Sequence, residues 1–178
     1  MTAPRLLLLL WGVLGALVSV SSAVYRLSPM IVEAIGHPDA GWLHLAVAVP
    51  WVGFMAYTEG YRGFQQRFSP MVVARGLHLV AHPKPLHVLL APIFCIGLFH
   101  ATPRRLKLSW GVLSAVVVLV MIVRQLPQPW RGVVDAGVVV GLTWGIVATL
   151  VFLVRALMGT PPNISAEIPE PAQAAAVS

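Results

Sequence analysis

Apolar residues dominate this sequence in long runs, which short polar or basic segments separate. Such runs predict membrane-spanning helices, because a helix needs about 20 apolar residues to cross a bilayer. We therefore predict an all-α, polytopic helical membrane domain over residues 1–159, followed by a disordered Pro- and Ala-rich tail at 160–178. The domain is predicted to contain about five transmembrane helices, near residues 6–24, 40–59, 86–101, 105–123 and 132–157.

Two shorter segments have patterns typical of amphipathic helices that lie in the membrane interface, 29–35 and 70–81. In the second of them, Arg75, His78 and His82 recur at spacings of three and four, so they share one helix face. We expect this face to point toward water. The segment at 60–68, where aromatic residues alternate with arginines, is predicted to be an interfacial loop.

Two of the predicted spans have alternative interpretations. The run at 86–101 is short and contains a proline, so it could form a re-entrant hairpin. A hairpin would bury Lys84 at a cost of at least about 2.5 kcal/mol, and we therefore favour a true span. The run at 6–24 could be a cleaved secretory signal, but it is longer than a typical signal core, which favours an uncleaved helix.

Composition agrees with a membrane protein. The chain is 58% hydrophobic and only 10% charged, far below the charge of a soluble domain. Its net charge of +6 does not indicate nucleic-acid binding, because the cations lie in short clusters between apolar runs. This distribution indicates contact with anionic lipid headgroups instead. Cys95 is the only cysteine, so no disulfide can form within one chain.

The charge distribution also gives a predicted orientation, for which we expect a bacterial inner membrane and a multi-pass topology. Five spans with the N-terminus inside place seven Lys and Arg residues inside and five outside, whereas a re-entrant 86–101 gives nine against three. In the five-span topology the second and fifth helices run antiparallel. Glu59 and Asp135 would then meet at one edge, together with Arg62 and Arg131.

Gly137, Gly141 and Gly145 form the strongest local pattern, a glycine zipper along one face of the last predicted span. Small residues spaced by four let another helix backbone approach closely. Packing within the chain is the preferred interpretation. Contact between copies and the lining of a pore are the alternatives.

The charged residues near the spans suggest an ion pair between Arg131 and Asp135, which Glu59 and Arg62 could join. A carboxylate beside hydrocarbon can instead serve as a proton or cation site. That alternative would make the protein a small transporter or channel with Asp135 and Glu59 on a polar path.

The histidines raise the possibility of a cofactor. His44 and His100 would lie at similar depth in a five-span topology, as an axial haem pair requires. His78 and His82, with His87 beyond them, could form a metal-binding face. Neither set has Glu or Cys at ligand spacing, so we predict no cofactor.

No motif for a nucleophile, a metalloprotease, a phosphate loop or a dinucleotide site occurs in the sequence. We therefore predict a non-enzymatic accessory or oligomeric membrane subunit whose helices pack through small residues. Its predicted partners are the lipid bilayer with its anionic headgroups and either further copies of the chain or a larger membrane complex. A small transporter or channel and a haem-binding or lipid-active membrane enzyme are the alternatives.

Overall fold

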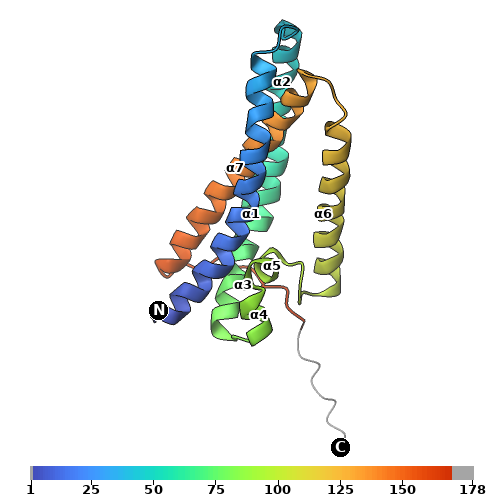
Figure 1. Ribbon diagram of the computed structural model, residues 1–178. Helices are drawn as coiled ribbons and strands as arrows, with labels where there is room; N and C mark the ends of the chain where they lie inside the picture. The colour runs from blue at the N-terminus through green and yellow to red at the C-terminus, as the bar shows by residue number, and fades with distance from the viewer. Residues whose placement is uncertain (1, 170–178) are drawn as a thin grey trace, which may run out of the picture.

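The computed structural model describes residues 2–169, and within that range the chain is helical without strands. Long helical rods run up and down the molecule (Figure 1). They are α1 (Ala3–Ile35), the continuous series α2 (Trp42–Met55), η1 (Ala56–Phe68) and α3 (Ser69–Ala81), then α6 (Pro103–Val123) and α7 (Trp130–Leu157). The short helices α4 (Pro85–Leu89) and α5 (Ala91–Ile96) lie at the end of the molecule where the N-terminus also lies.

The all-α prediction is confirmed. Of the helices in residues 2–169, α1, α6 and α7 are long and apolar enough to cross a membrane. The α2 helix has only 14 residues, but η1 and α3 continue it without a break. The chain therefore has three helices suited to a membrane and a fourth rod of comparable length.

Three expected surface elements are instead parts of long rods. Residues 70–81 belong to α3, the last part of the α2 and η1 rod, and residues 69–76 are buried rather than at a surface. Residues 29–35 continue α1 through Pro29, and this part of α1 packs on the start of α7, where Gly132 lies against Ala34. Residues 60–68 form most of η1, a π-helix, rather than a loop. Packing against α7 explains this helix, because Gly60 lies under the Trp144 ring.

The expected span at 86–101 is not a continuous helix. It consists of α4 and α5, which have five and six residues, followed by an irregular segment. Pro92 lies in the first turn of α5, where it has no N–H to continue a preceding helix. Gly97 then ends α5 in the left-handed region at φ 86°. This part of the chain turns back at one end of the molecule, which resembles the re-entrant alternative.

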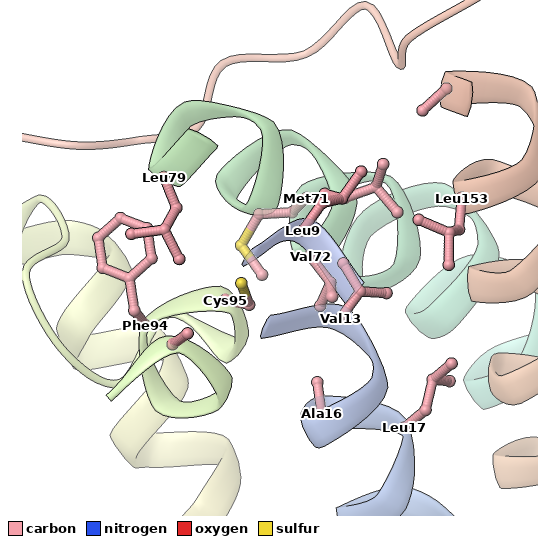
Figure 2. Packing of buried hydrophobic residues seen from close by; sticks show 13 residues of the cluster. Leu9, Val13, Ala16, Leu17, Met71, Val72, Leu79, Phe94, Cys95 and Leu153 are labelled. Carbon is pink, nitrogen blue, oxygen red and sulfur yellow. The ribbon is translucent and has the colours of Figure 1, made fainter. Parts of the chain in front are cut away.

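The main core lies where α1, α3, α5 and α7 meet (Figure 2). The α1 side chains interlock with those of α3 and α5, and Leu153 of α7 closes one side. Its fully buried members include Leu9, Val13, Val72, Val73, Leu79, Ala91, Phe94 and Cys95.

The α6 helix stands apart from the other long helices (Figure 1). Residues 110–122 are all exposed, and only 6% of its most apolar 18-residue window is buried, compared with 33% for α7. Its apolar surface is therefore open on every side within one chain.

Candidate functional site

The glycine face of α7 packs against the rod formed by α2 and η1. Gly137 lies beside Trp51 and Met55, Gly141 beside Glu59, and Gly145 against the ring of Phe64. All three glycines are buried. A Cβ atom at Gly141 would lie 3.0 Å from the Cβ of Glu59, whereas one at Gly145 would overlap the Phe64 ring. The glycines thus let two helices of the same chain approach closely.

These contacts show that α7 runs parallel to α2 and η1, not antiparallel. Residues 86–101 do not cross the molecule, so α6 is the one crossing between the two rods in the chain order. A single crossing returns the chain to the end where α2 began, and α7 therefore runs in the same direction as α2 and η1. Glu59 lies beside Gly141, six residues or about 9 Å along α7 from Asp135. The structure therefore does not bring Glu59 and Asp135 to one edge, and the predicted four-residue charge cluster does not form.

Arg131 and Asp135 do face each other, with 3.8 Å between Nε of the arginine and Oδ2 of the aspartate. The Asp135 side chain is 5% exposed and that of Arg131 is 29% exposed. Among the described residues, neither of these two atoms has a hydrogen-bond partner. The pair is an electrostatic contact at the start of α7, looser than a hydrogen-bonded salt bridge.

Arg75 is the most completely buried charged residue of the described chain, with 0% of its surface exposed. Its guanidinium donates four hydrogen bonds to backbone carbonyls, at 2.6 Å to Phe94, 2.8 Å to Ala166, 2.9 Å to Phe99 and 3.0 Å to His100. It also lies 4.3 Å from the centre of the Phe94 ring. The expectation that Arg75 faces water is wrong, because carbonyls of α5, of the irregular segment after it and of the segment after α7 replace water as its acceptors.

The side chains around Arg75 form a stack of rings. His87 packs on the Phe94 ring with centroids 4.8 Å apart and contacts the His100 ring at 4.5 Å. Burial lowers the pKa of His87 below its usual 6.5, and the charges of His100 and Lys84 lower it further. The neutral imidazole therefore suits this position.

The segment after α7 completes this centre. Ala166 supplies one of the carbonyls bound by Arg75, and the carbonyl of Glu167 accepts a hydrogen bond of 2.9 Å from the N–H of Thr102. The Glu167 carboxylate lies 3.7 Å from Nε of Arg105. Residues 166–168 of the predicted disordered tail thus pack on the protein, while 170–178 lie outside the described residues.

The predicted histidine pairs do not form ligand sets. His44 lies in the first turn of α2 with its ring 4.5 Å from that of Trp130 at the start of α7, whereas the ring of His100 contacts that of His87 in α4. The start of α2 and the short helix α4 lie at opposite ends of the molecule (Figure 1). His78 and His82 stack on each other at 4.7 Å, but His87 packs on Phe94 instead of joining them. In residues 2–169 no three His, Cys, Asp or Glu side chains come together as metal ligands.

The Arg75 centre supports a structural role more than a chemical one. Its nearby thiol, Cys95, is fully buried, and burial raises the pKa of this thiol to about 12, against the opposing effect of Arg75. A thiol in this state is a poor nucleophile. The arrangement holds α3, α5 and the segment after α7 together.

Sequence reasoning missed the role of Arg75, although a signal was present. Pro83, Pro85 and Pro92 prevent a single helix over the apolar run that follows. The backbone carbonyls of such a broken segment need donors other than helical N–H groups. The nearest preceding arginine is the natural source of these donors.

Comparison of the chain with protein-family models, with curated proteins and with solved structures finds no match.

Proposed function

We propose that this protein is a non-enzymatic, multi-pass membrane protein that functions as a subunit of a homo-oligomer. One observation carries the proposal. Glu59 and Arg62 are exposed, and Glu59 lies at the level of Gly141, near the middle of α7. If α7 crosses the bilayer, both charges lie deep in the hydrocarbon layer of a single subunit.

Exposure of charges at that depth is unfavourable. An ionised side chain at the centre of a membrane helix costs at least about 2.5 kcal/mol unless another polar group or water covers it. A second copy related by a two-fold axis along the membrane normal brings Arg62 of one subunit toward Glu59 of the other. Such a contact is self-complementary and occurs twice per dimer.

The exposure of α6 supports the same proposal. Its residues 110–122 have few contacts in their own chain, and nothing lies within 4 Å of a Cβ built on Gly111. Ala115 follows one turn later, so α6 offers a small-residue surface to a neighbouring helix. Helices of a membrane bundle are stabilised by such packing, which α6 lacks in the monomer.

The orientation follows from the charges at the two ends of the rods. The end that holds the N-terminus, α4 and α5 carries most of the cations, and the other end carries Arg124 and Arg131. We infer that the cation-rich end faces the cytoplasm of a bacterial cell, by the tendency of positive charges to remain inside. The cations of that end are Arg5, Arg75, Lys84, Arg104, Arg105, Lys107 and Arg155.

Charge reversal tests the proposed dimer. Glu59→Arg or Arg62→Glu alone places like charges across the interface and should shift the protein to monomers, measured by native mass spectrometry from nanodiscs. The double reversal restores opposite charges and should restore dimers. Arg104→Glu, at the exposed start of α6, is the matched control and should leave the mass unchanged. A monomeric wild type, or a double reversal no better than the singles, would falsify the proposal.

Cross-linking provides a second test, because the native cysteine is buried. Gln66→Cys, at an exposed position one turn after Arg62 on the same side of η1, should form a disulfide between two copies under mild oxidation. Leu7→Cys on α1, at a position 67% exposed, is the control and should remain monomeric. Equal cross-linking of both variants would indicate random collision and argue against the interface.

One observation favours transport as a second function. Oδ2 of Asp135 is buried without a hydrogen-bond partner among the described residues, so it could accept a proton or cation. Glu59 lies about 9 Å from Asp135 along α7, so a single transport path that uses both carboxylates would need further polar groups between them. Proton or cation flux into liposomes, lost in Asp135→Asn, would support this function. No flux, or equal flux in the variant, would remove it.

A further inference from the structure

A groove runs along the outer face of α7, and its lining combines apolar walls with a single cation at one end. Its volume is about 620 Å³. Val140, Val147, Val151 and Phe152 supply apolar walls, and Arg155 lies at the end nearest the C-terminus of the helix. From Val140 to Arg155 the groove follows about 22 Å of helix, more than the roughly 15 Å of hydrocarbon in one leaflet.

The polar wall of the groove is fixed by the π-helix. Gln65 of η1 accepts a hydrogen bond of 2.8 Å from the indole nitrogen of Trp144, so both side chains are held at the groove. A second hollow of about 350 Å³ shares Gln65 and Phe152 with the first and extends beneath Ile164. The two hollows are therefore neighbours that share the Gln65 and Phe152 side chains as a common wall.

We propose that this groove binds an anionic phospholipid, with the acyl chains against α7 and η1 and the phosphate on Arg155. Trp130 begins α7 and Arg155 lies in its last turn, about 37 Å away along the helix, so both suit the two headgroup layers of a bilayer. Arg155 would therefore meet lipid phosphate while the apolar walls meet hydrocarbon. The proposal requires that α7 spans a membrane, but it does not require the homo-oligomer.

Native mass spectrometry of the detergent-purified protein tests this site on the monomer peak. We expect phosphatidylglycerol to remain bound in preference to phosphatidylcholine. Arg155→Gln should reduce the phosphatidylglycerol preference about fivefold, the effect of one cation near a lipid phosphate. Arg104→Gln removes an exposed cation away from the groove and should leave the preference unchanged.

A second variant separates the acyl groove from the cation. Val151→Trp, at a position 49% exposed, should fill the groove and weaken both lipids, whereas Val117→Trp on α6, at a position 52% exposed, should weaken neither. Equal retention of the two lipids by the wild type, or equal effects of the Arg155 and Arg104 variants, would overturn the proposal. Displacement of phosphatidylglycerol by inorganic phosphate alone would assign the site to free phosphate and likewise overturn it.

Discussion

Arg75 and Asp135 are both buried charges in helical rods, but the protein accommodates them differently. Arg75 makes four hydrogen bonds to backbone carbonyls that come from segments 19 to 91 residues away. Asp135 has a single charged neighbour, Arg131, on its own helix and 3.8 Å away. The first arrangement ties distant parts of the chain together, and the second adds no connection between helices.

Both side chains are buried, so burial alone does not indicate a structural role for a charged residue. A buried charge with fixed acceptors specifies one arrangement of the segments that supply them. A buried charge whose partner lies on the same helix leaves the positions of the other segments unspecified. The two ends of the molecule should therefore respond very differently to substitution.

The largest effect is expected at Arg75. Arg75→Met leaves four carbonyls without their donor and should lower stability by about 3 kcal/mol or more, since each unsatisfied buried group costs about 1–3 kcal/mol. Thermal melting in detergent measures this loss. The rate of Cys95 labelling by a maleimide should rise at the same time, because the segment after α7 loses its bond to Arg75 and α5 becomes less tightly held. Arg104→Met is the control, and equal melting of both variants would contradict the assigned role.

Substitution of the α7 glycines that face α2 and η1 should give the next largest loss of stability. Gly145→Ala places a methyl group into the Phe64 ring and should destabilise by about 1–3 kcal/mol, the usual range for overpacking. Gly141→Ala should cost less, because its methyl group would lie 3.0 Å from the Cβ of Glu59, which can shift slightly. Melting temperatures of the two variants test this order, and the reverse order would argue against the packing described.

At the Asp135 end we expect an asymmetric response. Arg131→Gln leaves Asp135, only 5% exposed, without its charge partner, which should cost about 2–3 kcal/mol. Asp135→Asn leaves Arg131, whose side chain is 29% exposed and can reach water, so the loss should stay within about 1 kcal/mol. Denaturation of both variants at neutral pH gives the comparison, and equal losses would show that the two charges are equally dependent on each other.

The smallest effect concerns pH at the Arg75 end. The folded protein holds the pKa of His87 below 6.5, so the unfolded chain binds a proton more readily. Stability should be unaffected well above pH 6.5 and should fall as the pH drops below 6.5 toward the lowered folded pKa. His87→Gln should reduce this acid sensitivity in melting curves between pH 5 and pH 7.5. An unchanged slope would assign the sensitivity to another group.

The sequence predicts the helical class because long apolar runs leave few alternatives. It also indicates the Arg131 and Asp135 pair, since spacing of four on a helix brings side chains together regardless of tertiary structure. The burial of Arg75 was not predictable from its own segment, because its acceptors come from residues up to 91 positions away. The helical state of η1 was equally hard to predict, because its polar residues suit a loop. Its stabilising contacts are with α7, where Trp144 packs on Gly60 and Phe64 packs on Gly145.

The contact between Arg75 and Ala166 has a consequence for biosynthesis. Arg75 is synthesised well before Ala166, which follows 91 residues later. During that interval α6 and α7 are still being made, and one N–H of the guanidinium has no protein acceptor at its final position. Phe94, Phe99 and His100 follow Arg75 within 25 residues, so the other three bonds can form before α7 is complete. The segment after α7 therefore supplies the last of the four bonds, and a chain stopped before Ala166 would fold without it.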